Sequence, residues 1–136
     1  MNVEFLLCAY FISLFVDWVF QNQWQANNKS NWEKENRFYA ISALWQHSFI
    51  YAVGTFFGLW ICTLAGASFI LQPWPVAVLF ATHFAIDNRI PVKFIMKLKG
   101  ITEEQMANPR MDFMHIGIDH RLHEMVLLVM AFFVGA

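Results

Sequence analysis

The sequence predicts an all-α, polytopic membrane protein: a helix bundle with about four transmembrane helices in a single domain over residues 1–136. Two observations lead to this prediction. Hydrophobic residues make up 58% of the chain and charged residues only 14%, whereas soluble domains average about 25% charged residues. The apolar residues also gather in runs long enough to cross a hydrocarbon core of about 30 Å. Backbone polar groups in such a core must be hydrogen-bonded within the segment, so the runs are expected to be helices.

The composition excludes several other classes of protein. The formal net charge of −1 provides no basic surface for nucleic acid. A disordered chain is excluded because 15 Phe and 6 Trp residues require burial. A disulfide scaffold is excluded as well, since Cys8 and Cys62 both lie in apolar runs and form no CxxC motif.

The first expected span covers residues 3–21. Its start has no cationic region and carries Glu4, and no small-residue cleavage site follows it, so we expect a retained helix rather than a cleaved signal peptide. The second and third spans are expected at 38–63 and 66–88. A turn near Ala65 would place His47 and His83 at the same level, whereas Pro73 and Pro75 favour a later start of the third helix. The sequence leaves this choice open.

The fourth span is expected at 111–135, after Asn108 and Pro109, which suit the N-cap and first position of a helix. Residues 22–37 and 89–110 are then loops. In the second loop, residues 91–99 alternate apolar and cationic side chains, as an interfacial helix or a solvated linker would. Thr102 and Gln105 have the spacing of a capping box, which predicts another short helix.

Cationic residues give the orientation of the bundle. Eight of the nine Lys and Arg residues lie in the loops 22–37 and 89–110, and the segment 64–75 and both chain ends contain none. By the positive-inside rule, both loops face the cytoplasm and both termini face the periplasm. The ninth, Arg121, is expected to pair with Glu124 three residues later on its helix.

Ionisable residues within the spans are costly in a membrane and therefore indicate a function. Many of them are four residues apart, which places them on one face of their helix. With the predicted orientation, four helices bring these side chains to nearly the same depth, towards the cytoplasmic side. The polar residues concerned are Ser13, Asp17, Gln21, His47, His83, Asp87, His115, Asp119, His120, His123 and Glu124.

This pattern predicts a divalent metal site. Imidazole and carboxylate groups at i, i+4 spacing are typical ligands of zinc, with manganese and iron as alternatives. Hydrogen-bonded packing between helices would also use such residues, and it explains His47 taken by itself. The expected ligands are Asp17, His47, His83, Asp87, Asp119 and His123. Residues expected to orient these ligands are Ser13, Gln21, His115, His120 and Glu124.

The same residues resemble a family of small integral membrane proteins of bacteria and their phages, known as domain of unknown function 3307. The run from Asp17 to Ser30, DWVFQNQWQANNKS, is similar to the family's D-F-x-x-Q-x-x-W-x-A-x-N-K-S. An isolated histidine at His47, an HxxxD at His83 and a terminal DQxxH at Asp119 complete the resemblance. This resemblance implies the fold, the polar cluster and a bacterial or host inner-membrane location, but no particular reaction.

Two departures from the family pattern concern the polar residues. His120 replaces the usual glutamine, and Ser13 stands where members commonly carry a histidine four residues before the aspartate. If that histidine is a ligand in the family, this chain lacks it or uses Ser13 or His120 instead.

Three functions follow as hypotheses. The first is a metal-dependent hydrolase open to the cytoplasmic leaflet, acting on a lipid or lipid-linked substrate, with Asp17 and Asp119 as catalytic candidates. The second is transport or sensing of protons or divalent ions, for which a four-helix chain would form a homo-oligomer. The third is a non-enzymatic, phage-encoded protein that interacts with membrane components, in which the polar cluster serves packing alone. Membrane lipids are expected partners in each case.

Overall fold

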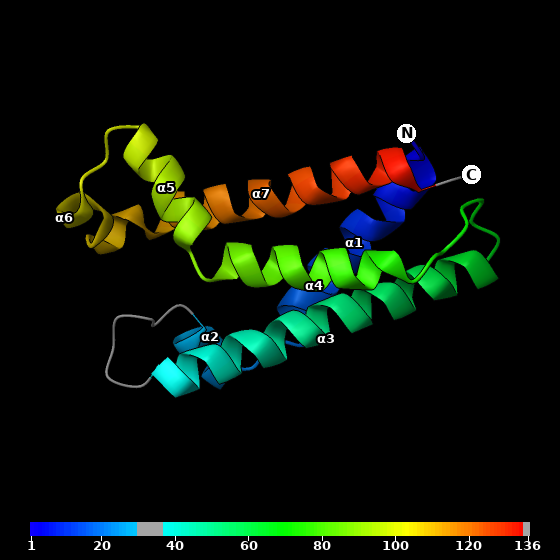
Figure 1. Cartoon of the computed structure of the whole chain (residues 1–136), viewed down its shortest axis with the longest axis horizontal. Coiled ribbons are helices and arrows are strands. Elements are labelled where there is room, and N and C mark those ends of the chain that lie inside the picture. The colour runs from blue at the N-terminus through cyan, green and yellow to red at the C-terminus, as the bar shows by residue number, and fades with distance from the viewer. Residues whose placement is uncertain (30–36, 135–136) are drawn as a thin grey trace.

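The computed structural model describes residues 1–29 and 37–134, and these residues form helices and connecting loops without any strand (Figure 1). The prediction of an all-α fold is therefore confirmed. The long helices are α1 (Val3–Val19), α3 (Arg37–Leu64), α4 (Trp74–Asp87) and α7 (Asp112–Phe133). The short ones are α2 (Gln23–Asn28), α5 (Ile90–Leu98), α6 (Glu103–Met106) and the 3-10 helix η1 (Pro109–Met111).

The four long helices pack as a bundle in which α3 contacts α1 and α4, and α7 contacts the same two helices. One end of the bundle holds both chain termini and the α3–α4 connection, and the other end holds α2, α5 and α6 (Figure 1). A hydrogen bond from Asn2 N to the carbonyl of Ala131, 2.7 Å long, ties the start of α1 to α7 at the first of these ends.

The α3–α4 connection has both features between which the sequence left the choice open: an early turn and a late start of the next helix. The chain turns directly after Leu64 through Gly66, whose φ of 100° is a conformation that glycine adopts readily. The chain then folds back along the bundle, and the expected helix over 66–88 begins only at Trp74. Pro75 in its first turn suits a helix start, because the first backbone N–H groups of a helix have no intrahelical acceptor.

The loop between α4 and α7 contains the two short helices that the sequence suggested. In α5, Val92 and Met96 are buried, whereas Ile90, Phe94 and Leu98 are exposed. Thr102 and Gln105 form the predicted capping box of α6. Asn108 accepts a hydrogen bond from Arg110 N and caps η1, after which α7 begins. Residues 30–36 of the first loop and 135–136 of the fourth span lie outside the described residues.

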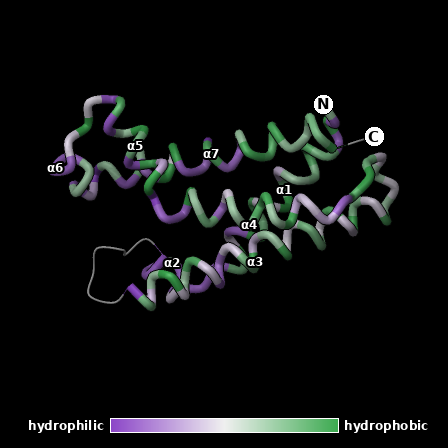
Figure 2. Tube along the Cα trace, viewed as in Figure 1, coloured by the Kyte–Doolittle hydropathy of each residue, from purple (hydrophilic) through white to green (hydrophobic). Residues whose placement is uncertain are grey.

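By length and composition, α3 is long and apolar enough to cross a membrane; α4 is apolar but shorter. Within residues 1–29 and 37–134 the structure thus supplies one candidate span, and the prediction of four spans stays a prediction. Large apolar side chains nevertheless face outwards on other helices, for example Phe11 on α1 at 66% exposed and Phe113 on α7 at 86%. Figure 2 shows hydrophobic residues along the long helices and hydrophilic ones concentrated around α2 and α6.

Two glycines allow α1 and α3 to approach closely. A Cβ atom at Gly54 would lie 2.9 Å from Val16 Cγ1, and one at Gly58 would overlap Ile12 Cγ2. Small residues spaced by four commonly mediate such contacts between helices. Beyond these glycines, towards the chain termini, a core of apolar side chains fills the bundle; it includes Phe5, Ala9, Leu59, Leu79, Leu127 and Met130.

Candidate metal centre

The polar cluster continues the buried face of each long helix beyond the apolar core. On α1, Phe5, Ala9 and Ser13 are buried at intervals of four residues, and Asp17 is the next residue of this series. On α4, the same interval joins the buried residues Leu79, His83 and Asp87. Helical period places these residues on the same face as the buried apolar residues, and that face points into the bundle.

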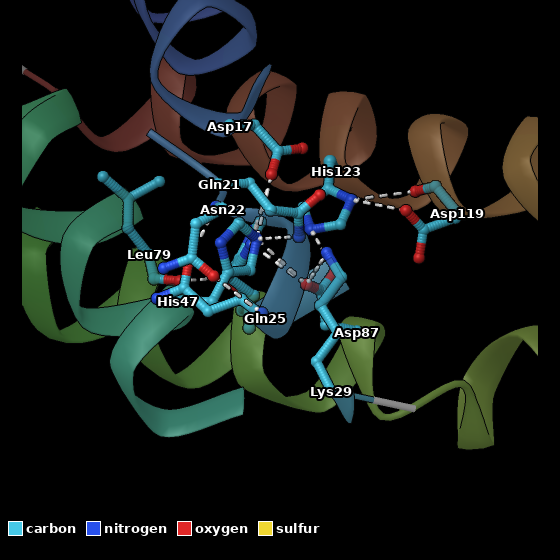
Figure 3. A network of polar contacts seen from close by, with 12 residues as sticks. Asp17, Gln21, Asn22, Gln25, Lys29, His47, Leu79, Asp87, Asp119 and His123 are labelled. Atoms are coloured by element: carbon cyan, nitrogen blue, oxygen red, sulfur yellow. Dashed lines mark hydrogen bonds and ion pairs between the residues drawn. The ribbon is translucent and has the colours of Figure 1, made fainter. Parts of the chain in front are cut away.

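Four atoms from three helices meet at the centre of the cluster, and Figure 3 labels three of the residues that carry them, Asp17, His47 and Asp87. His47 Nε2 lies 3.0 Å from Asp17 Oδ1, 3.2 Å from Asp87 Oδ2 and 3.0 Å from His83 Nε2. His83 Nε2 in turn lies 3.3 Å from Asp87 Oδ2 and 3.8 Å from Asp17 Oδ1. Both histidines and Asp87 are buried, and the side chain of Asp17 is 20% exposed. The sequence predicted that these residues lie at one level, and the structure brings them together.

These separations are compatible with a metal ion held between the side chains. Ligand atoms about 2.0–2.1 Å from a tetrahedral zinc ion lie about 3.3 Å from one another. Two neutral imidazoles that face each other through Nε2 can share only a single hydrogen bond. Asp17 Oδ1 is buried and has no hydrogen-bond partner among the described residues, although His47 Nε2 is 3.0 Å away. Asp17, His47 and His83 form a group of side chains able to hold a metal ion.

A second group of this kind consists of His83, Asp87 and His123. His123 Nε2 lies 3.7 Å from Asp87 Oδ1 and has no hydrogen-bond partner among the described residues. The other ring nitrogen, Nδ1, lies 3.0 Å from the carbonyl oxygen of Asp119 and 3.7 Å from its Oδ2. Asp119 therefore belongs to neither group, and its carboxylate lies on the far side of the His123 ring.

Tyr51 was not among the residues singled out from the sequence. Its ring stacks on His83 with the centroids 3.7 Å apart and an interplanar angle of 14°, and it lies 5.9 Å from the ring of His123. This contact restricts the orientation of the His83 ring. The sequence does not indicate that a single aromatic residue in an apolar helix stacks on a histidine. The only indication for Tyr51 is its position one turn after His47.

Lys29 is the other residue that the sequence did not assign to the cluster. It was counted only as a cation of the first loop, but its Nζ lies 2.6 Å from Asp87 Oδ2. The capping box formed by Asn22 and Gln25 begins the short helix α2, and Lys29 directly follows that helix. Its ammonium group offsets the negative charge of a carboxylate that is only 2% exposed. The only indication in the sequence that Lys29 belongs to the cluster was its position in the N-K-S end of the family motif.

The residues expected to orient the ligands divide into two sets. Gln21 belongs to the cluster, with Nε2 3.4 Å from His47 Nε2. Ser13 donates a 3.1 Å hydrogen bond to the carbonyl of Tyr10, and Glu124 pairs with Arg121 as predicted. His120 packs edge-to-face against Trp18, and His115 is buried elsewhere on α7.

An open cavity of about 310 Å³ adjoins the cluster. Asp17 and Asp87 contribute to its wall. The remaining wall includes Lys29, Arg89, His115 and Asp119. The arrangement thus combines a group of side chains able to bind a metal ion with a space large enough for a small polar group.

Comparison with known proteins identifies a family for this chain but assigns it no function. No curated protein and no solved structure matches the chain. The family described as "Protein of unknown function (DUF3307)" matches residues 3–136, nearly the full length. The match includes all residues of the cluster and of the cavity wall. The chain is therefore a member of the DUF3307 family.

Proposed function

We propose that this protein is a membrane-embedded, metal-dependent hydrolase with its metal centre in the polar half of the bundle. The observation that carries this proposal is the convergence of Asp17 Oδ1, His47 Nε2, His83 Nε2 and Asp87 Oδ2, with the five contacts given above between 3.0 and 3.8 Å. Two imidazole nitrogens and two carboxylate oxygens form a donor set suited to zinc, and manganese or iron would accept it as well.

The ion would lower the pKa of a bound water towards about 7 and so provide a nucleophile at neutral pH. His123 would accept the proton of that water. Its Nδ1 faces Asp119, which favours a hydrogen at Nδ1 and leaves Nε2 free towards the cluster. In this assignment Asp119 is a positioning residue, and Asp17 binds metal rather than acting as the base.

The distribution of side chains supports a membrane location. Apart from the candidate span α3, helices α1 and α7 expose large apolar residues while ionisable residues lie inside the bundle. A water-soluble protein shows the opposite arrangement, since large exposed apolar patches cost free energy in water. A lipid or lipid-linked substrate fits because it reaches the cavity from within the bilayer.

Transport of protons or ions receives less support. The titratable side chains form a continuous set from Asp17 to Asp119, which a proton relay would need. At the opposite end, however, the bundle is filled by apolar residues such as Leu59, Leu79 and Leu127. A pathway across the membrane would have to pass through this packed region.

The proposed activity is tested with the full-length chain in lipid nanodiscs, using lipids that carry fluorogenic ester or phosphoester groups. We expect product release that stops with a chelator, returns with zinc and falls at least about 100-fold in His123→Gln, the range for loss of a general base. His123→Gln should still fold and keep most of its zinc. Hydrolysis that persists in the chelator, or no hydrolysis of any of these lipids by the zinc-loaded protein, would contradict the proposal.

Membrane insertion is tested by fractionation of cells that express the chain. An integral protein stays in the membrane fraction at alkaline pH and is released by detergent. Release into the alkaline supernatant without detergent would contradict the proposed location.

A further inference from the structure

The cavity beside the cluster has an unusual charge balance. The carboxylates of Asp17, Asp87 and Asp119 line it together with two full cations, Lys29 and Arg89. The net charge of the wall is negative without a metal ion. A divalent ion held by Asp17 and Asp87 reverses it to positive, and bound cations are often the largest local charges in a site. The loaded cavity is therefore suited to an anion.

Arg89 is held in this wall at a cost in backbone conformation. Its φ is 62°, and among the described residues no other non-glycine residue has a positive φ. It lies between the last residues of α4 and the first of α5, where glycine would adopt this conformation with less strain. An arginine at such a position points to a role for its side chain, and its guanidinium group binds phosphate with two parallel hydrogen bonds.

His115 supplies a second, independent observation. This side chain is 6% exposed, lines the cavity, and neither of its ring nitrogens has a hydrogen-bond partner among the described residues. The backbone of Met106 and the charged groups of Arg89, Asp112 and Lys93 interact electrostatically with the ring. A buried imidazole without a partner is costly, and an anionic oxygen in the cavity would provide one.

We infer that the cavity binds the phosphate group of a phospholipid headgroup between the metal ion, Arg89 and His115. This inference rests on the proposed function, because the metal supplies the charge that makes anion binding favourable. Lys29 lines the same space, but its ammonium group is already paired with Asp87.

The rim of the cavity favours a lipid over free phosphate. Trp18 of α1 and Ile116 of α7 line it, and they are 71% and 53% exposed. A volume of about 310 Å³ accommodates a headgroup but not the acyl chains as well. The chains would therefore remain outside, against the exposed apolar side chains of α1 and α7, while the phosphate enters between these helices.

The test measures binding of short-chain phosphatidate to the purified full-length protein, by titration calorimetry, with and without zinc. Inorganic phosphate and short-chain diacylglycerol, which carry the phosphate and the chains separately, are the matched ligands. Arg89→Gly is the informative variant, because glycine suits the positive φ and the variant should fold at least as well as the wild type. Arg110→Gln, at an exposed arginine of η1, is the control.

We expect phosphatidate to bind the zinc-loaded wild type at least about tenfold more tightly than the zinc-free protein or Arg89→Gly, with zinc content unchanged in the variant. His115→Gln should weaken binding as well, and Arg110→Gln should not. If Arg89→Gly with normal zinc content bound phosphatidate as tightly as the wild type does, this inference alone would be overturned. It would also be overturned if inorganic phosphate or diacylglycerol bound the zinc-loaded wild type as tightly as phosphatidate does. A wild-type protein that retains no metal would overturn the proposed function and this inference with it.

Discussion

The two halves of the bundle use the same helices and the same buried faces for different purposes. Near the chain termini, α1 buries Phe5 and Ala9 against Leu59 of α3 and Leu127 of α7. One to three turns further along, the corresponding positions hold ionisable residues, such as Asp17 on α1 and His123 on α7. The change from apolar to ionisable residues occurs on α1, α4 and α7, whereas α3 contributes His47, beyond which Leu44 and Ala43 are buried.

This difference separates two roles of buried residues. Among the described residues, the core of the apolar half contains no charged side chain, and Glu4 at this end is exposed and accepts a hydrogen bond from Ser68 N. The polar half carries two neighbouring carboxylates, Asp17 and Asp87, and the partners at hand are histidines and a single ammonium group from Lys29. Packing alone does not require carboxylates there, since apolar residues of similar size are often as stable or more so. A metal ion would account for their presence.

The largest expected effect is the loss of metal binding when the polar half loses a ligand. Asp17→Asn and Asp87→Asn keep the side-chain shape but remove the charge that attracts the ion. Each should lower zinc affinity by more than about 100-fold, beyond the range found for residues that only orient ligands. Zinc retention after dialysis measures this, with His115→Gln as the matched control for a buried residue outside the cluster. Normal retention in both Asp variants would exclude these carboxylates as ligands.

The second largest effect is expected when the ammonium group of Lys29 is removed. Lys29→Met leaves Asp87 without its ion-pair partner and should lower the free energy of unfolding of the zinc-free protein by about 3 kcal/mol. The zinc-loaded protein should lose much less, because the ion offsets the same charge. Thermal unfolding with and without zinc checks this, and Lys97→Met, in an exposed ion pair, is the control. An equal loss in both forms would show that Lys29 and the metal act independently.

A change in the apolar half should alter stability without altering the metal site. Gly58→Ala places a methyl group against Ile12 and should cost about 2 kcal/mol through overpacking. Gly117→Ala, where no atom lies within 4 Å, should instead stabilise α7 slightly. Adding Ile12→Ala to Gly58→Ala should restore part of the loss. Zinc affinity should be unchanged in Gly58→Ala and in the double variant, and a change there would mean that the halves are coupled.

A smaller effect is expected for Asp119→Asn. If Asp119 only orients His123, zinc affinity should fall by about tenfold at most. A fall as large as that of Asp17→Asn would make Asp119 a direct ligand, as the sequence analysis allowed.

The smallest effect concerns the exposed loop between α4 and α7. A hydrogen bond from Lys97 holds the pKa of Glu103 below its usual value. Because the folded-state pKa is the lower one, the contribution to stability is present above the unfolded-state pKa and is lost as the pH falls through the folded-state pKa. Glu103→Gln should therefore leave the melting temperature nearly unchanged at neutral pH, and any difference from the wild type should vanish in acid. A large change in melting temperature would contradict the exposed position of the pair.

The helices and the polar cluster were predictable because both follow from helical period. The i, i+4 spacing of His83 and Asp87 fixes their common face whatever the tertiary structure, and loop charges suggested which residues lie at one level. The features that were missed depend on contacts between distant segments. Lys29 reaches Asp87 from another part of the chain, and Tyr51 stacks on His83 across two helices. Residues Asp119 and His115 share α7 with His123 but lie further from the shared centre, which depends on how that helix packs.

The central claim is that the polar half of the bundle holds a metal ion, and elemental analysis of the purified full-length protein tests it most directly. We expect about one zinc, manganese or iron ion per chain in the wild type, and close to none in Asp17→Asn and Asp87→Asn variants that fold with the helical content of the wild type. A wild-type protein that binds no divalent metal after purification and zinc reconstitution would contradict the account. So would stoichiometric metal that both variants retain.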